Sequence, residues 1–90
     1  MGAQTNTAFP YKAQAIILLS GRGQITVIDK ALEILNSYSL KVIERQDINM
    51  AGLIISAIQI GFDPAHASAI EKELSDSMAS HGIDVALDLI

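Results

Sequence analysis

Two short segments of this 90-residue chain are apolar at almost every position: Ala15–Leu19 and Leu53–Ile60. Successive side chains of a strand point to opposite faces, so a strand that is apolar throughout has both faces shielded from water. Apolar segments this short, bounded by turn residues, are typical of buried strands. We therefore expect both segments to occupy the middle of one sheet.

Two other segments carry more charge and are expected at the edges of that sheet. Residues 40–49 combine apolar side chains with Lys41 and with a charged and amide run from Glu44 to Asp47. Residues 83–89 alternate apolar side chains with aspartates and an alanine. Charged side chains are common on edge strands, where they discourage pairing with other chains. Gly52 supplies a permissive backbone position, so residues 49–52 are predicted to form a hairpin turn.

Two segments between these strands have the periodicity of helices. The first helix begins near Val27 and ends at Ser37–Ser39. The second begins at Asp63 and Pro64, because Asp is a favoured N-cap and Pro fits the first helical position. Gly82 is expected to close it in the left-handed conformation. The first helix is predicted to bury a wide stripe, formed by Val27, Ala31, Ile34 and Tyr38 with Ile28, Leu32 and Leu35 beside them. The predicted buried stripe of the second helix is Ile70, Leu74 and Met78.

The order strand, helix, strand, strand, helix, strand predicts an α+β fold, the ferredoxin-like βαββαβ sandwich. Its antiparallel four-stranded sheet has the order 4-1-3-2, with both helices on one face. We expect residues 13–90 to form this domain and residues 1–12 to be a flexible N-terminal tail. The uncovered face would expose a contiguous apolar patch, which usually marks an interface. A homodimer through the sheet is therefore expected.

Composition excludes several classes of partner. Six basic residues against ten acidic ones give a net charge of −4, and only 4% of the residues are aromatic. This balance argues against nucleic acid and against anionic membranes. The chain has no cysteine and its two histidines lie fifteen positions apart, so no metal site is expected. Neither a signal peptide nor an apolar run of membrane-spanning length is present, so a cytoplasmic location is predicted.

The segment Ser20–Gln24 is the strongest candidate for a ligand site. It is predicted to join a central strand to the start of a helix, where free backbone N–H groups suit a carboxylate or phosphate. Its two glycines allow a ligand to come close, and Arg22 could add a charge-assisted hydrogen bond. A tight turn with a solvated arginine explains the same residues. Both interpretations remain open on the sequence.

The topology and this loop resemble those of acylphosphatases. The loop of that family continues with Gly-Val and Phe/Tyr-Arg, whereas this chain has Ile25–Asp29. The family's Asn-bearing strand has no counterpart in residues 40–49. Without these groups nothing would orient water or hold the transferred phosphoryl group. An acylphosphatase-like enzyme is therefore only a minor alternative.

A second resemblance covers residues 13–90. It rests on the segments Ser20–Val27, Leu32–Leu40, Val42–Gln46 and Met78–Asp88. These are similar to the glycine-rich loop, leucine-rich helix end, second strand and closing segment of the ACT domain. Within that family they resemble the N-terminal ACT domain of bacterial phosphoserine phosphatases.

This resemblance implies a regulatory domain that binds an amino acid, such as serine, at a dimer interface. The ligand-binding residues that it implies are Gly21, Arg22, Gly23, Gln24 and, from across the interface, Lys41. The family's acidic loop residue, proline and glycine are replaced by Gly23, Ile25 and Thr26. A second hypothesis therefore stays open, in which a degenerate ACT domain serves only dimerisation.

The resemblance does not make this chain an enzyme. Haloacid-dehalogenase-type phosphatases need an Asp-x-Asp-x-Thr nucleophile segment, which the sequence lacks. We expect no catalytic residue and no cofactor here, and a parent phosphoserine phosphatase of L-serine biosynthesis. The sequence ends at Ile90 within its last apolar strand, which favours a domain of a longer protein.

Overall fold

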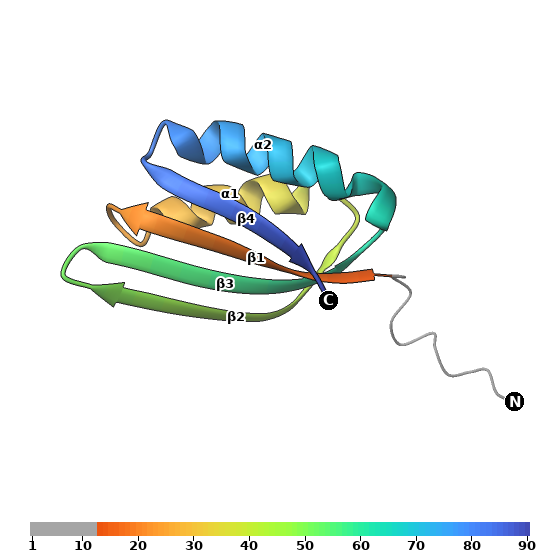
Figure 1. Ribbon diagram of the computed structural model, residues 1–90, viewed down its shortest axis with the longest axis horizontal. Helices are drawn as coiled ribbons and strands as arrows, with labels where there is room; N and C mark the ends of the chain where they lie inside the picture. The colour runs from red at the N-terminus through yellow and green to blue at the C-terminus, as the bar shows by residue number, and fades with distance from the viewer. Residues whose placement is uncertain (1–12) are drawn as a thin grey trace, which may run out of the picture.

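Four strands and two helices follow one another in the predicted order (Figure 1). The computed structural model describes residues 13–90, and the predicted tail, residues 1–12, lies outside the described residues. A short 3₁₀ turn, η2, precedes the second helix. The elements are β1 (Ala13–Arg22), α1 (Val27–Asn36), β2 (Lys41–Met50), β3 (Leu53–Phe62), η2 (Pro64–His66), α2 (Ala67–Ala79) and β4 (Ile83–Leu89).

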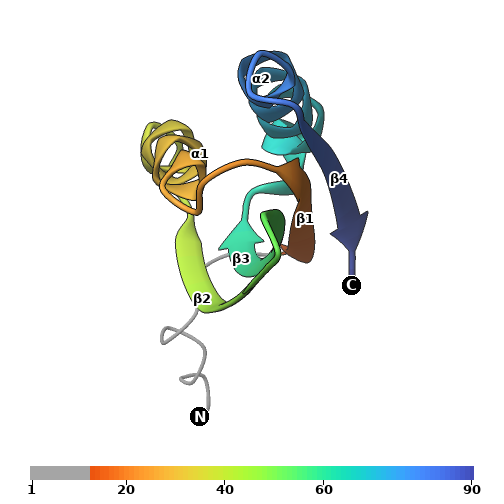
Figure 2. The same cartoon turned by 90° about the vertical axis from the view of Figure 1, so that its left-hand side faces the viewer.

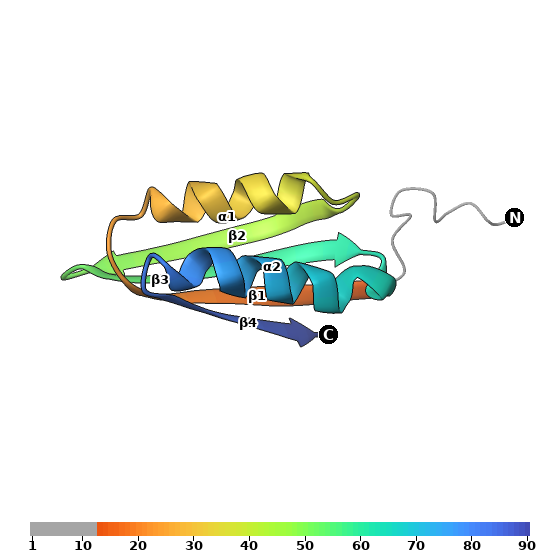
Figure 3. The same ribbon diagram turned by 90° about the horizontal axis from the view of Figure 1, so that it is seen from above.

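The strands form one sheet in the order β2-β3-β1-β4, and all three neighbouring pairs are antiparallel. Both helices cover the same face of this sheet (Figure 2). Seen from above, they lie side by side along the direction of the strands (Figure 3). The predicted ferredoxin-like topology, with its central apolar strands and charged edge strands, is confirmed.

The core lies between the sheet and the two helices. Alternate residues of β1, from Ala15 to Leu19, are fully buried, and Ile17 lies opposite Ile58 of β3. Both helices contribute their predicted stripes, and α2 buries the three expected residues. In α1 the fully buried members are Ile28, Ala31 and Leu35, and the rest of the predicted stripe is partly buried against the core. The remaining buried apolar side chains are Ile54, Ile60, Phe62 and Ile83.

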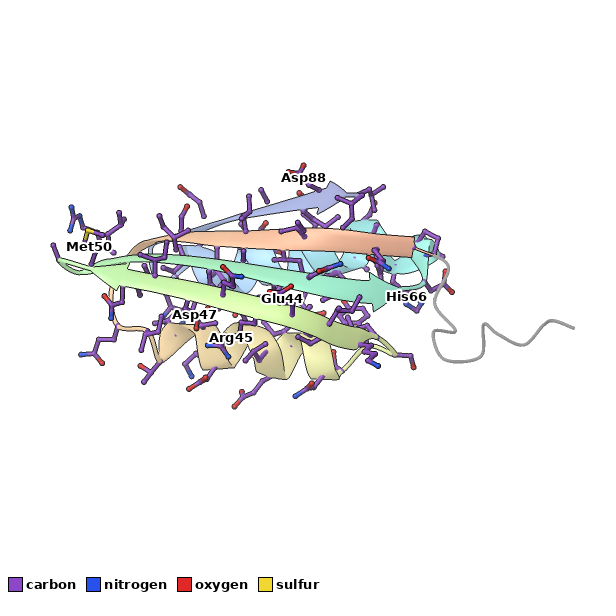
Figure 4. All side chains as sticks on the ribbon, turned by 90° about the horizontal axis from the view of Figure 1, so that it is seen from below. Glu44, Arg45, Asp47, Met50, His66 and Asp88 are labelled. Atoms are coloured by element: carbon purple, nitrogen blue, oxygen red, sulfur yellow. The ribbon has the colours of Figure 1, made fainter. Side chains whose placement is uncertain are left out.

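The outer face of the sheet carries apolar side chains on its central strands, but not the contiguous apolar patch that the sequence predicted. Leu18, Leu53 and Ile55 remain 36–39% exposed on this face. Figure 4 views this face with the sheet in front of the helices. A pair of glutamines, Gln14 and Gln59, interrupts the apolar surface and is joined by a hydrogen bond of 2.8 Å. The uncovered face is therefore partly, not continuously, apolar.

The end of β1 differs from the prediction. Ser20, Gly21 and Arg22 were expected in a turn, but they continue the strand. All three pair with β3, and Ser20 and Gly21 also pair with β4. Pairing on both sides overrides the turn preference of the local sequence, which is only a weak constraint. The connection to α1 is therefore limited to residues 23–26.

The other boundaries follow the predicted signals closely. The hairpin turn consists of Ala51 and Gly52, whose φ angles are 51° and 79°, as a two-residue turn of twisted strands requires. Asp63 accepts a hydrogen bond from the Ala65 amide and so caps η2, which leads into α2. Gly82 has φ 73° and confirms the predicted left-handed cap. The first helix ends at Asn36, before Tyr38.

Candidate functional site

Gly21 lies within β1, opposite Ile54 of β3 and Ile83 of β4. A Cβ atom at this position would overlap the carbonyl oxygen of Gly82 and would lie 3.1 Å from the Cα atom of Ile83. The close approach of the chain before β4 therefore requires a glycine here. Packing inside the protein is enough to explain why residue 21 is a glycine. The predicted contact of Gly21 with a ligand is not needed for this explanation.

In the loop that follows Gly21, part of the backbone is already hydrogen-bonded within the chain. Gly23 has φ 153°, and its amide donates to the carbonyl oxygen of Gly52 at 3.1 Å. The amides of Val27, Ile28 and Asp29 donate back to the carbonyl oxygens three residues earlier, at 3.0–3.1 Å. These four N–H groups are therefore not free to bind a ligand.

Three amides of the loop remain. Within residues 13–90, the N–H groups of Gln24, Ile25 and Thr26 have no backbone acceptor, and the Thr26 hydroxyl does not cap α1. The start of a helix carries a partial positive charge that favours anions. Asp29 in the first turn opposes a negatively charged ligand. The arrangement can accept one small anionic group, such as a carboxylate.

Arg22 stands beside this loop. Its side chain is exposed, and one guanidinium nitrogen, Nη1, donates to the carbonyl oxygen of Ala51 at 3.0 Å. The guanidinium has five N–H donors, so this single bond leaves others available. Arg22 therefore links the end of β1 to the β2–β3 hairpin turn and lies at the same end of the sheet as the loop amides.

Lys41 lies at the opposite end of the sheet. It pairs with Gly61, and Gly61 pairs with Gln14 near the start of β1. Gln14 and Gly21 are seven strand residues apart, which corresponds to roughly 23 Å. Within one chain, the structure brings Gly21, Arg22, Gly23 and Gln24 together and leaves Lys41 apart.

The most connected polar group in the described residues is one that the sequence did not single out. Ser56, fully buried on β3, donates to Asp47 Oδ1 on β2 at 2.6 Å. Arg45 donates through Nε to both carboxylate oxygens of Asp47, at 3.1 and 3.0 Å, and its Nη2 lies 2.7 Å from Oδ2. Figure 4 shows Arg45 and Asp47 beside α1.

These contacts shift the ionisation of the pair. The hydrogen bond from Arg45 is the main reason that the pKa of Asp47 lies below its usual value, and the Ser56 hydroxyl lowers it further. The same bond raises the pKa of Arg45. Both groups are therefore charged at neutral pH. Residues 45 and 47 share a strand face, but only the register with β3 places Ser56 opposite Asp47.

A second polar contact joins the segment that follows α1 to α2. The Tyr38 hydroxyl donates to Glu73 at 2.6 Å, and this bond is the main cause of the raised pKa of Tyr38. The His66 ring lies 5.9 Å from the Tyr38 ring, and its buried Nδ1 has no hydrogen-bond partner among the described residues. Tyr38 thus lies outside α1 and still packs against the core.

Hollows lie on two parts of the surface formed by residues 13–90. One, of about 150 Å³, lies on the outer sheet face and is lined by Ile16, Glu44, Gln46, Ala57 and Gln59. The other, of about 560 Å³, lies between α2 and β4. Residues 13–90 contain no group of three or more His, Cys, Asp or Glu side chains that could hold a metal ion. Among the helices described, none is long and apolar enough to cross a membrane.

Comparisons with known proteins identify the fold. No protein-family model matches the chain, and no curated protein matches it significantly by sequence. An ACT domain protein from Streptococcus pneumoniae superimposes with a TM-score of 0.73 and 9% identity, over 86% of this chain and 89% of that protein. A protein from Galdieria sulphuraria, described as unknown, gives 0.75 and 15% identity, over 90% and 51%.

Formyltetrahydrofolate deformylase from Pseudomonas putida KT2440 gives a TM-score of 0.74 with 13% identity over 82% of this chain. The chain spans only 28% of the length of that deformylase. At such low identity these likenesses establish the fold alone. The chain has the ferredoxin-like fold that an ACT domain protein also has, and this agrees with the resemblance of its sequence.

Proposed function

We propose that this chain is a regulatory domain that binds a small effector, an amino acid, at the β1–α1 loop. The observation that carries the proposal is the group of three amides, Gln24 to Thr26, without backbone acceptors at the start of α1. They lie at the same end of the sheet as the exposed guanidinium of Arg22. A carboxylate bound there would satisfy the amides and attract the arginine.

The fold supports this proposal in general terms, because an ACT domain protein has the same architecture. L-Serine is the first effector to test, since the sequence resembles the N-terminal ACT domain of phosphoserine phosphatases. The parent enzyme, its place in L-serine biosynthesis and a cytoplasmic location stay predictions. So does the absence of catalytic activity from this chain.

The proposed partner in assembly is a second copy of the chain, paired through the sheet. Apolar side chains on the outer face and on β2 support this pairing, because burying them would remove them from water. A second copy is also the source from which Lys41 could approach the effector. The alternative function is assembly without any effector, and the replacements Gly23, Ile25 and Thr26 in the loop favour it.

The test is an amide NMR titration of the full chain with L-serine and then with other amino acids. We expect saturable shifts at Gln24, Ile25 and Thr26, and none in the middle of α2. Arg22→Ala should weaken binding by roughly tenfold, because a charge-assisted hydrogen bond is lost. Lys72→Ala on α2 is the matched control and should leave binding unchanged.

Three results would contradict the proposal. A flat titration with every amino acid, from a chain that is folded and self-associated, would establish the assembly function instead. Equal affinity for the Arg22→Ala variant and the wild-type chain would remove the arginine from the site. Shifts centred on the outer-face hollow rather than on the loop would place the effector elsewhere.

A further inference from the structure

The hollow on the outer face of the sheet offers hydrogen-bond acceptors. Its lining combines apolar and polar side chains: Ile16, Ala57, Glu44, Gln46 and Gln59. The Nε2 atom of Gln46 already donates to Glu44 Oε2 at 3.1 Å. The Nε2 atom of Gln59 donates to Gln14 Oε1 at 2.8 Å. Within residues 13–90, the Oε1 atoms of Glu44, Gln46 and Gln59 accept no side-chain hydrogen bond, so a ligand that suits this hollow brings donors.

Glu44 adds a negative charge to the hollow. Neither of the two ion pairs formed within residues 13–90 includes it. The cations of the outer face lie toward the two ends of the sheet, where Arg22 pairs with Leu53 and Lys41 pairs with Gly61. The hollow therefore suits a positively charged group that carries N–H donors, and an ammonium group has both properties.

A second carboxylate lies at the far end of the same row of the sheet. Glu44 of β2 pairs with Gln59 of β3. Ile16 of β1 pairs with Gln59 on one side and with Asp88 of β4 on the other. Directly opposed residues of antiparallel strands share a face, so all four side chains lie on the outer face. Figure 4 shows Glu44 and Asp88 on opposite sides of β1, at about the same level along the strands.

The spacing of the strands sets the length of a ligand that joins these two carboxylates. Three gaps of about 4.8 Å separate the backbones of β2 and β4 by roughly 14 Å. A charge-assisted hydrogen bond of about 2.8 Å at each end leaves roughly 9 Å between two donor nitrogens. A zigzag chain of about seven single bonds, each about 1.5 Å long, spans this distance, which corresponds to about six methylene groups.

We infer that the outer face of the sheet binds a linear aliphatic diamine, laid across the strands with one ammonium group on Glu44 and the other on Asp88. The ammonium group in the hollow donates to Glu44 and to the amide oxygens around it. The methylene groups lie over Ile16, which is half-buried, and remove apolar surface of both partners from water.

This site is separate from the effector site proposed for the β1–α1 loop. Ile16 and Gly21 are five strand residues apart, which corresponds to roughly 16 Å. The loop amides suit a carboxylate, which a diamine lacks, and Glu44 repels the carboxylate of an amino acid. The inference therefore goes beyond the proposed function and does not depend on it.

An amide NMR titration of the full chain with hexamethylenediamine tests the site. We expect saturable shifts at Ile16, Gln59 and Asp88, and NOE contacts between the ligand methylenes and the Ile16 methyl groups. The loop amides of residues 24–26 should not shift. Hexylamine has the same carbon chain without the second ammonium group. It should bind about fivefold more weakly, because it forms one exposed ion pair instead of two.

Three substitutions that each remove one carboxylate charge locate the ammonium groups. Glu44→Gln should weaken the binding of both amines by about fivefold, because both place an ammonium group in the hollow. Asp88→Asn should weaken only the diamine, to the affinity of hexylamine. Glu71→Gln is the matched control, since Glu71 is exposed on α2, and it should leave both affinities unchanged. The NMR spectrum of each variant without ligand shows whether it is folded.

Each other outcome overturns the inference. A wild-type chain that shows no saturable binding refutes the site, including the case in which a second copy covers the outer face. Equal affinity for the two amines, or an equal loss of both in Asp88→Asn, refutes the bridge between the carboxylates. Weakening by Glu71→Gln as large as that by Glu44→Gln would show that only net charge matters. The serine titration is followed at the loop amides, so failure here leaves the effector site to its own test.

Discussion

Replacing Gly21 with alanine tests whether this glycine serves packing or the ligand. A Cβ atom there would overlap the Gly82 carbonyl oxygen and would lie 2.9 Å from the Ile83 Cδ1 atom. The Ile83 methyl can rotate away, but the backbone oxygen cannot move without carrying the start of β4. We therefore expect the last pair of the β1–β4 ladder, Gly21 with Ile83, to open.

The expected loss follows from three contributions. Overpacking costs about 1–3 kcal/mol, and losing one ladder contact costs about 1 kcal/mol. Removing a glycine from the unfolded chain offsets about 0.4–1 kcal/mol of this. The free energy of unfolding should fall by about 1–3.6 kcal/mol, which lowers the melting temperature of a domain this small by roughly 4–8 °C per kcal/mol.

Urea denaturation followed by far-UV circular dichroism measures the change. Ser20→Ala is the matched control, since Ser20 lies next along β1 with its side chain on the outer face, and its effect should stay within about 0.5 kcal/mol. If Gly21→Ala is as stable as wild type and instead weakens effector binding, the packing argument is wrong. The glycine then belongs to the ligand site, as the sequence alone allowed.

Two further changes test local contacts. Asp47→Asn should cost about 1 kcal/mol at neutral pH. Because the folded-state pKa of Asp47 is lowered, this difference should be present above pH 3.8 and shrink as the pH falls below it. Urea titrations above and below pH 3.8 measure the difference in stability between wild type and Asp47→Asn, with the exposed Asp76→Asn as control. A difference that stays the same at both pH values would show that the charge of Asp47 is not its cause. Asp63→Ala removes the cap on Ala65 and should cost about 1 kcal/mol in thermal melts. No change in the melt would show that η2 needs no cap.

The sequence predicted the topology because each element carried its own local signal. Apolar runs marked the central strands, charges marked the edges, and Asp63 and Gly82 marked the two ends of the η2–α2 segment. These signals depend on nearby residues, so one sequence is enough to interpret them. The confirmed strand order followed from the rule that central strands are the most apolar.

The site was predicted less well, because its features depend on long-range pairing. Ser20–Gly21–Arg22 has the composition of a turn, yet two neighbouring strands hold it extended. Nothing local to Gly21 indicates that Gly82 approaches it. The contact of Ser56 with Asp47 likewise depends on the register of β2 with β3. The spacing of Arg45 and Asp47 along one strand does not tell what lies opposite them.

The bulge in β2 changes which residues of the strand face the helices. Val42 pairs with Ile60, and after one inserted residue Asp47 pairs with Ser56, so both side chains turn toward the helices. In an unbroken strand these two positions would point to opposite faces, since one is even and the other odd. Deleting Ile43 would remove the bulge and leave Glu44 paired with Gln59, so Arg45 and Asp47 would still face the helices. If Ile43 instead took a regular place in the ladder, Glu44, Gln46 and Ile48 would face the helices in place of Arg45 and Asp47. The inserted residue at the bulge therefore determines which side chains of β2 face the core.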